Sequence, residues 1–459
     1  MEALMIGVSG LRGTIGGTLT PLVVSRMAGA FAAWLKANAK PANGKHFTLV
    51  LGRDSRPSGT WVRDAAVAAL TASGIEVIDL DIVTTPGVAM MVKHLGADAG
   101  MVVTASHNPI EWNGLKLLNR NAVAPPPLDA NAIIAMYHDH RTAFVWVQDL
   151  IAPRTCGQTH ALHVQRVLEH VDVLGISSKR LKVVLDSVNG AGGVATAMLL
   201  SRLGCQVVHM NATPDGQFPH EPEPTAKNLT GLCDEVRRQK ASVGFAQDPD
   251  ADRLAVVDEK GNYIGEEYSL ALAAKWIMSR KAGAVAVANL SSSRMLDDIA
   301  SAHGGRVIRT PVGEANVIDC MIANNATIGG EGNGGVIDPR IVPGRDSLVG
   351  IAYVLQLMAA TNKTIGQLVG EIPRYEIVKT KFDCKREDAD RAVEAIKKQF
   401  AHERTDTQDG IRIDWENAWV HARPSNTEPI MRIIAEAPDR ATADLKIAQV
   451  QDVVNRTLG

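Results

Sequence analysis

Paired cysteines are missing from this 459-residue sequence, whose five cysteines stand at positions 156, 205, 233, 320 and 384. An odd number without a CxxC pair argues against a cysteine metal site and a disulfide framework, and is typical of a reducing compartment. Long apolar runs are missing too, because stretches such as SLALAAKWIM are too short or too interrupted to span a bilayer. The opening MEALMIGVSG carries an acid and no basic stretch, so we expect no signal peptide. These absences predict a cytoplasmic protein that does not act at a membrane.

The sequence also lacks an excess of charge of either sign. Its formal net charge is −2, from 48 basic and 50 acidic residues, so no nucleic-acid partner is expected. Hydrophobic residues make up 46% and charged residues 21%, which is enough apolar content for a packed core and argues against disorder. Because single domains usually run to ~100–200 residues, a chain of this length should contain several.

Short β-type runs that end in polar, glycine-rich loops, each followed by a helix-type segment, recur along the chain. HFTLVLG leads into GRDSR and a helical WVRDAAVAALTASG, and SVGFAQ leads into DPDADR. This alternation predicts α/β domains with mixed, largely parallel sheets and functional loops at the carboxyl ends of strands. Breaker residues suggest four domains, at 1–151, 152–254, 255–371 and 372–459. We expect one helix over 157–175, and an α+β fold for the last domain.

Three carboxylates at alternate positions follow an expected strand: Asp248, Asp250 and Asp252. An extended chain turns alternate side chains the same way, and like charges held together repel unless a cation offsets them. Oxygen-only ligands favour Mg²⁺ or Ca²⁺ over Zn²⁺. Three alternatives stay open here. An EF-hand loop would match Glu259 at its last position but has Arg253 where glycine is required, and a phosphatase with a nucleophilic aspartate or a solvated acidic turn would also fit.

Ser106 lies in TASHNP at 104–109, directly after another expected strand. A tight turn there would expose the hydroxyl, His107 could assist proton movement, and backbone N–H groups could hold an anion. The GxSxG elbow is absent, so a hydrolase triad is not indicated. Lys116 could be a proton-transfer group. An ordinary turn and a solvated lysine remain the alternatives for these residues on local grounds.

Two more loops are rich in side chains that form hydrogen bonds, one suited to a phosphate and the other to hydroxyl groups. RPSNTEP at 423–429 joins a guanidinium to short hydrogen-bonding side chains, which suits a phosphate. Ser425 and Glu428 would also fit a helix capping box, but the IMRII that follows favours a strand. GEGNGG at 330–335 displays Glu331 and Asn333, which suit sugar hydroxyls, although a hairpin turn would look the same.

Six motifs occur in order along nearly the whole chain: GLRG at 10–13, GRDSR at 52–56, TASHNP, DPDADR, GEGNGG and RPSNTEP. Together they resemble the α-D-phosphohexomutase superfamily, and GVSGLRG and GGEGNGG resemble its phosphoglucosamine mutase-like branch. The resemblance implies three consecutive related α/β domains and a C-terminal α+β domain around a central cleft. It implies an enzyme that interconverts hexose 6- and 1-phosphates through a phosphoserine and a bisphosphosugar. Phosphomannomutase or phosphoglucomutase specificity, a metal-dependent sugar phosphatase and a sugar-phosphate-binding protein are the alternatives.

The resemblance also implies a role for each motif residue. Ser106 would carry the phosphate and, with Asp248, Asp250 and Asp252, hold Mg²⁺. Around the transferring phosphoryl group we expect Arg12, His107, Lys116 and Arg253. Substrate binding is expected from Glu331, Asn333, Arg423, Ser425, Asn426 and Thr427, and from Glu314 in a loop. A hexose 1,6-bisphosphate activator is implied, and the protein is expected to be a monomer or homodimer. Gly334 and Gly335 stand where many members have Gly-His, so the sugar is left open.

Overall fold

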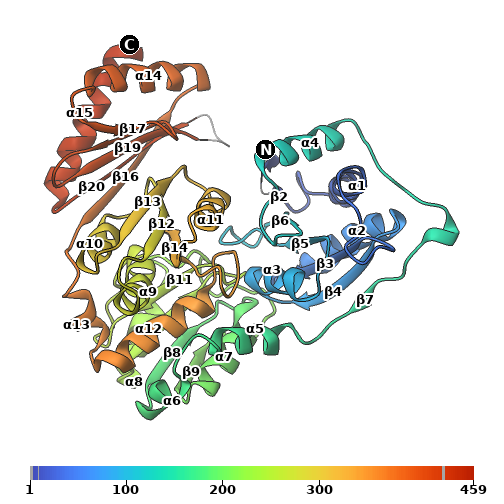
Figure 1. Cartoon of the computed structure of the whole chain (residues 1–459), viewed down its shortest axis with the longest axis horizontal. Coiled ribbons are helices and arrows are strands. Elements are labelled where there is room, and N and C mark those ends of the chain that lie inside the picture. The colour runs from blue at the N-terminus through green and yellow to red at the C-terminus, as the bar shows by residue number, and fades with distance from the viewer. Residues whose placement is uncertain (1–3, 9, 426–429, 459) are drawn as a thin grey trace. The chain divides into compact units, whose positions relative to one another are not determined.

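The computed structural model describes residues 4–8, 10–425 and 430–458. The chain forms two compact units, Met1–Trp276 with Asn333–Val369 and Ile277–Gly332 with Gly370–Gly459, and it passes from the first to the second within one helix. Figure 1 labels most of their helices and strands. Among the described residues, no helix combines the length and the apolar character needed to cross a bilayer.

A seven-stranded mixed sheet in the order β1-β2-β6-β5-β3-β4-β7 begins the first unit. Strands β5, β3, β4 and β7 are parallel, whereas β1, β2 and β6 pair antiparallel with their neighbours. The elements are β1 Met5–Gly7, β2 Gly10–Thr14, α1 Pro21–Asn38, β3 Thr48–Arg53, α2 Gly59–Ala72, β4 Glu76–Ile82, α3 Thr85–His94, β5 Ala99–Val103, β6 Trp112–Asn119, α4 Pro127–His138, a 3₁₀ turn Val147–Asp149 and β7 Arg154–Thr155.

Helices cover both faces of this sheet. Successive side chains of a strand face opposite sides. In β3, Leu49 and Leu51 therefore join a core with α1, α2 and α4, while Val50 joins a second core with α3. The result is the three-layer α/β arrangement that the sequence predicts.

Close pairing of β2 with β6 sets two basic side chains beside each other. Gly10 has φ +121°, and a Cβ there would lie 1.9 Å from Leu115 O, so only glycine fits this approach. The register places Arg12 opposite Gly114. Because Lys116 is two residues further along β6, it shares a sheet face with Arg12.

A second sheet of the first unit has the order β11-β10-β8-β9, in which only β11 is antiparallel. The elements of this part are α5 Thr159–Leu168, α6 Val173–Ser178, β8 Lys182–Asp186, α7 Gly192–Arg202, β9 Gln206–Met210, α8 Thr230–Gln239, β10 Val243–Gln247, β11 Leu254–Val257, α9 Glu267–Arg280, β15 Gly335–Ile337, α12 Ser347–Thr361 and α13 Ile365–Val369. The single helix expected over 157–175 is wrong. Asp172 accepts a hydrogen bond from Gly175 N (2.9 Å) and caps a new helix, α6.

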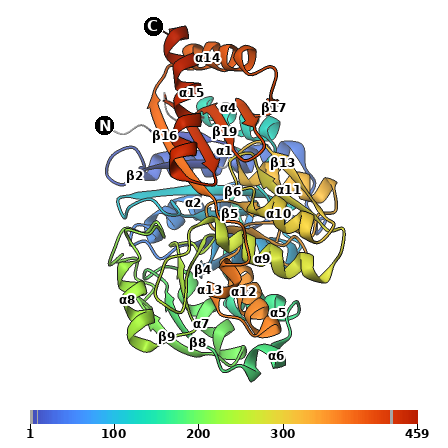
Figure 2. The same ribbon diagram turned by 90° about the vertical axis from the view of Figure 1, so that its left-hand side faces the viewer.

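The second unit combines a parallel and an antiparallel sheet. Strand β12 pairs in parallel with β13 and β14, and a five-stranded antiparallel sheet has the order β16-β20-β19-β18-β17. Helices α14 and α15 pack on one face of the latter through a continuous apolar core (Figure 2). The elements are β12 Val285–Asn289, α10 Met295–Ala302, β13 Arg306–Thr310, α11 Glu314–Ala323, β14 Ile328–Glu331, β16 Glu376–Asp383, α14 Arg386–Gln399, β17 Arg404–Asp406, β18 Ile411–Asp414, β19 Trp419–Pro424, β20 Ile430–Ala437 and α15 Arg440–Leu458. The expected C-terminal α+β fold is present.

Candidate active site

Ser106 lies in the turn after β5, at the carboxyl end of a parallel strand. It adopts φ +51°, which is uncommon for a non-glycine residue, and its N–H donates to Thr104 Oγ1 (2.8 Å). Its hydroxyl donates to Asp248 Oδ2 (2.9 Å), although the two residues are 142 positions apart. The structure thus brings together the serine and the acidic triplet that the sequence analysis singled out separately.

A fully buried arginine holds the serine turn in shape. Arg56 Nη2 donates to the carbonyls of Ser106 (2.7 Å) and Asn108 (2.6 Å), and Nη1 donates to Pro109 O (2.6 Å). Its Nε donates to Asp54 Oδ2 (3.0 Å), which balances the buried charge. The sequence analysis noted the GRDSR motif but gave these residues no role, because their partners lie about fifty positions away.

The acidic triplet lies between β10 and β11, and its geometry fits a bound cation. Strands on both sides exclude the EF-hand alternative, which needs flanking helices. One oxygen from each aspartate lies within 4.8 Å of the others. Asp250 Oδ1 and Asp252 Oδ1 are buried and have no hydrogen-bond partner within the described chain. A hard cation would satisfy both oxygens, which are otherwise costly to bury.

Cations from elsewhere in the first unit reach the other carboxylate oxygens. Lys116 Nζ lies 2.6 Å from Asp250 Oδ2 and 3.1 Å from Asp252 Oδ2. Burial and the neighbouring carboxylates raise the pKa of Asp248 well above its ordinary value. Burial would also raise the pKa of Asp252, but Arg345 and Lys116 outweigh it and hold that pKa well below the ordinary value.

Two contacts to the triplet were missed by the sequence analysis. Arg345 Nη2 donates to Asp252 Oδ2 (2.6 Å), and Thr85 Oγ1 donates to Asp250 Oδ2 (2.6 Å). A signal for Arg345 was present, because the Gly-Arg-Asp-Ser of GRDSR recurs at 344–347. Thr85 had none, since it begins α3 as an ordinary first-turn threonine.

The remaining expected catalytic residues of the first unit lie close to Ser106. His107 Nδ1 is 3.4 Å from Ser106 Oγ, and burial together with Arg253 and Arg12 lowers the pKa of His107 to about 3, so its imidazole is neutral. Arg12 Nη1 donates to Asn108 Oδ1 (3.3 Å). The backbone N–H of Arg253 donates to Asp248 Oδ1 (3.0 Å).

The expected substrate-binding residues divide between the two units. Asn333 belongs to the first, and its buried Oδ1 has no partner among the described residues. Glu331 ends β14 in the second unit, where it accepts a hydrogen bond from Asn289 Nδ2 (2.9 Å). Glu314 was expected in a loop, but it is the first residue of α11, whose N-cap is Gly313.

The motif expected to bind phosphate, RPSNTEP, begins at the end of β19. Arg423 Nε lies 2.8 Å from Asp409 Oδ2, and Ser425 N donates to Ile430 O (2.8 Å). Strand β20 starts at Ile430, so a strand follows the motif and the capping-box alternative is excluded. Asn426 and Thr427 lie outside the described residues.

Four sequence families match the chain in order. They are phosphoglucomutase/phosphomannomutase alpha/beta/alpha domain I at residues 3–143, domain II at 161–261, domain III at 265–375 and the C-terminal domain at 380–453. The chain belongs to the phosphoglucomutase/phosphomannomutase family. It is therefore an enzyme, a phosphohexomutase, as the ordered motifs predicted.

Relatives that match nearly the whole length of this phosphohexomutase are named for different sugars. A phosphoglucomutase/phosphomannomutase of Thermococcus kodakarensis is 36% identical over 96% of both chains. A protein of Methanopyrus kandleri named "probable phosphoglucosamine mutase" is 33% identical, covering 98% of this chain and 97% of the relative. The crystal structure of a phosphoglucomutase/phosphomannomutase family protein of Burkholderia thailandensis has a TM-score of 0.84 at 26% identity, covering 99% of this chain and 98% of that one.

Proposed function

We propose that this phosphohexomutase interconverts the 6- and 1-phosphates of a hexose, with glucosamine phosphate preferred, through a phosphate carried on Ser106. One observation carries the proposal. The Ser106 hydroxyl lies 2.9 Å from Asp248 Oδ2, beside two buried aspartate oxygens that have no hydrogen-bond partner among the described residues. Mg²⁺ bound by Asp248, Asp250 and Asp252 would supply positive charge to the phosphoryl oxygens.

The chain's own residues account for the rest of the transfer. The P–O bond to Ser106 breaks as a P–O bond to the sugar hydroxyl oxygen forms, and the proton of that hydroxyl ends on Ser106 Oγ. Burial would lower the pKa of Lys116, but Asp250 and Asp252 outweigh it and raise that pKa, so we assign to its ammonium group positive charge beside the phosphoryl group. We assign the proton transfer to the neutral imidazole of His107, which accepts the proton of the sugar hydroxyl and passes it to Ser106 Oγ, 3.4 Å from Nδ1. Arg12 and Arg253 complete the positive surroundings of the phosphoryl group.

The product of this first transfer is a hexose 1,6-bisphosphate, which must turn around before its other phosphate returns to Ser106. Each orientation needs a grip on the phosphate that is not reacting, and we assign that grip to Arg423, Ser425, Asn426 and Thr427. Glu331, Asn333 and Glu314 are assigned to the sugar. Free bisphosphosugar would prime unphosphorylated enzyme, so we propose it as the activator.

The experiment is a 1-to-6 phosphate exchange assay with Mg²⁺ and hexose 1,6-bisphosphate. Wild-type protein should interconvert the two phosphates, and its intact mass should show a fraction that carries one extra phosphate. Ser106→Ala should lose both properties. A matched control is Ser178→Ala, since Ser178 is an exposed serine whose hydroxyl donates to Gly175 O (2.7 Å) in its own helix.

Two outcomes would instead favour the rival functions. Phosphate release that survives Ser106→Ala would indicate a sugar phosphatase. Tight binding without turnover, and without a phosphorylated fraction, would indicate a sugar-phosphate-binding protein.

The preferred sugar is the finer part of the proposal. Relatives named for glucosamine phosphate and the GGEGNGG loop support glucosamine, while the Thermococcus kodakarensis relative supports glucose or mannose. Values of kcat/KM for the three sugar phosphates, measured side by side, decide between them. A higher value for mannose or glucose phosphate would overturn the glucosamine assignment and leave the mutase assignment intact.

A further inference from the structure

A buried polar path starts at the proposed sugar-reading carboxylate of the second unit. Asn289 ends β12 and donates from Nδ2 to Glu331 Oε1 (2.9 Å). Its Oδ1 accepts from Ser291 N (2.9 Å) and from Ser292 Oγ (3.0 Å), so the orientation of the amide is determined by its partners. Glu331 is thereby tied to the loop that follows β12.

The path continues from this loop to the C-terminal sheet. His421, in β19, is fully buried, with Nδ1 2.8 Å from Ser291 Oγ and Nε2 2.7 Å from Asp409 O. Burial lowers the pKa of His421 to about 4, so the ring is neutral and has one N–H. Since the Asp409 carbonyl can only accept, Nε2 carries the proton and Nδ1 accepts from the Ser291 hydroxyl.

The same aspartate reaches the proposed phosphate grip. Asp409 Oδ2 lies 2.8 Å from Arg423 Nε and accepts from Val312 N (3.0 Å). Gly410 permits this close approach: it has φ +65°, and a Cβ there would lie 2.3 Å from Ala422 O. Hydrogen bonds and one ion pair thus connect the proposed sugar contact to the proposed phosphate contact. The path runs through six residues in this order: Glu331, Asn289, Ser291, His421, Asp409 and Arg423.

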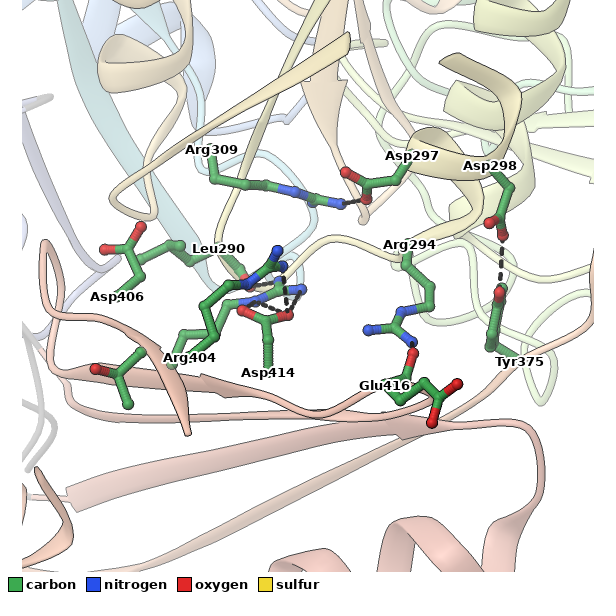
Figure 3. Close-up of a pocket in the computed structure, with 12 residues that line it drawn as sticks. Leu290, Arg294, Asp297, Asp298, Arg309, Tyr375, Arg404, Asp406, Asp414 and Glu416 are labelled. Carbon is green, nitrogen blue, oxygen red and sulfur yellow. Dashed lines mark hydrogen bonds and ion pairs between the residues drawn. The ribbon is translucent and has the colours of Figure 1, made fainter. Parts of the chain in front are cut away.

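Three arginines hold the loop after β12 in place, around a cavity of about 520 Å³ in the same unit (Figure 3). Arg309 donates to the carbonyls of Asn289 (3.1 Å) and Ser292 (2.9 Å), which holds the loop after β12. Arg412, from β18, donates to Leu290 O in that loop, and Arg294, at the end of the loop, donates to Glu416 O (2.8 Å) in the turn between β18 and β19. The loop and the sheet are therefore bound to each other in both directions.

We infer that Ser291 and His421 are positioning residues that set the separation between Glu331 and Arg423, and so determine which length of sugar phosphate the enzyme accepts. The inference rests on the proposed function, which assigns the sugar to Glu331 and the distal phosphate to Arg423. A hexose phosphate holds its ring hydroxyls and its phosphate at a spacing set by covalent bonds. If Glu331 and Arg423 are held at a fixed separation, they select ligands with that spacing. If they moved independently, they would also accept ligands with other spacings.

The experiment removes one hydrogen bond of the path and leaves Glu331 and Arg423 unchanged. Ser291→Ala removes the donor to His421, and Ser291→Thr keeps a hydroxyl and should restore wild-type behaviour. His421→Gln keeps a donor for Asp409 O but loses the acceptor at Nδ1, so it should act like Ser291→Ala. Tyr375→Phe is the matched control, because it deletes a hydrogen bond of the same unit, to Asp298 (2.8 Å), that lies off the path.

We expect Ser291→Ala to raise KM for hexose 6-phosphate about fivefold with kcat nearly unchanged, the effect of one lost hydrogen bond. The preference for hexose 6-phosphate over ribose 5-phosphate, as a ratio of kcat/KM, should fall by a similar factor. Calorimetric Kd values for the two sugar phosphates should show the same loss of preference, whether or not the protein turns them over.

Failure of this inference is distinguishable from failure of the proposed function. The inference is overturned if Ser291→Ala and His421→Gln keep the wild-type preference for hexose 6-phosphate over ribose 5-phosphate. Variants that lose thermal stability and kcat but keep this preference would indicate a purely structural role, and would also overturn it. Wild-type protein that binds hexose phosphates but does not isomerise them overturns the proposed function. In that case the ratio of Kd values still decides the inference.

Discussion

Arg345 Nη2 donates a 2.6 Å hydrogen bond to Asp252 Oδ2, so the loop before α12 supplies a second cation, with Lys116, to the third aspartate of the triplet. The other oxygen of Asp252 accepts no hydrogen bond within the described chain. A guanidinium and a metal ion could therefore share this carboxylate, one on each oxygen. If Asp252 binds the proposed metal ion, Arg345 would orient this ligand.

Replacing Arg345 by methionine should lower kcat/KM by roughly 10- to 100-fold, because a hydrogen bond to a charged group contributes ~1.5–3 kcal/mol. The measurement is the exchange assay at saturating Mg²⁺. The control is Arg374→Met, which removes an exposed ion pair to Glu376 and should change nothing measurable. A kcat/KM for Arg345→Met within twofold of wild type would refute the assignment.

The metal site gives a prediction that does not depend on turnover. Mg²⁺ at 100 times its Kd should stabilise the wild-type fold by ~2.7 kcal/mol, since an ion that binds only the folded state shifts unfolding by mass action. In Asp250→Asn both this stabilisation and kcat should be lost. Thermal unfolding with and without Mg²⁺ measures it, with the exposed Asp234→Asn as control. Equal stabilisation of wild type and Asp250→Asn would place the ion elsewhere.

Arg56 should be needed for stability as well as activity. Arg56→Met leaves the Asp54 carboxylate buried without its cation and releases three carbonyls of the serine turn, so we expect a loss of ~3–5 kcal/mol in unfolding free energy. Urea unfolding measures this loss. Arg63→Met, which breaks partly exposed pairs with Asp64 and Asp79, should cost less than ~1 kcal/mol. Similar costs for the two variants would contradict the role given to Arg56.

The pair of His220 and Asp186 predicts a pH-dependent term in stability. Burial alone would lower the pKa of His220, but its hydrogen bonds to Asp186 and to Glu221 O outweigh burial and raise that pKa. Burial alone would raise the pKa of Asp186, but its hydrogen-bond partners, His220 first, outweigh burial and lower that pKa. A raised histidine pKa stabilises the fold below the unfolded value of about 6.5, and this is lost as pH rises through the folded value. The Asp186 contribution is present above about 3.9 and lost as pH falls.

Both contributions are therefore present near pH 5.5, and that of His220 is gone near pH 9. His220→Gln should destabilise the protein more at the lower of these two pH values, as measured by urea unfolding at each. His402→Gln, on an exposed side chain, should cost little at either. A larger cost of His220→Gln at the higher pH would reverse the sign of the argument.

The sequence predicts well those features that are local along the chain. Asp248 and Ser106 each follow an apolar run that reads as a buried strand, so β10, β5 and their loops were found, and ordered motifs led to the family. Arg345 and His421 were not assigned, because their partners lie 93 and 130 positions away and a lone arginine or a strand histidine has no local signature. Strand β16 was missed since alternate residues such as Lys379 and Lys381 are polar, as suits an edge strand.

The turn around Ser106 is gripped through its main chain, because Arg56 binds carbonyl oxygens and no side chain of the turn. Hydrogen bonds to main-chain carbonyls do not depend on which side chains the turn residues carry. The shape of the loop and the identity of the residue at position 106, the proposed phosphate carrier, are thus separable properties of the scaffold. This makes position 106 suited to protein engineering, where a thiol or another acceptor could be installed in an unaltered backbone.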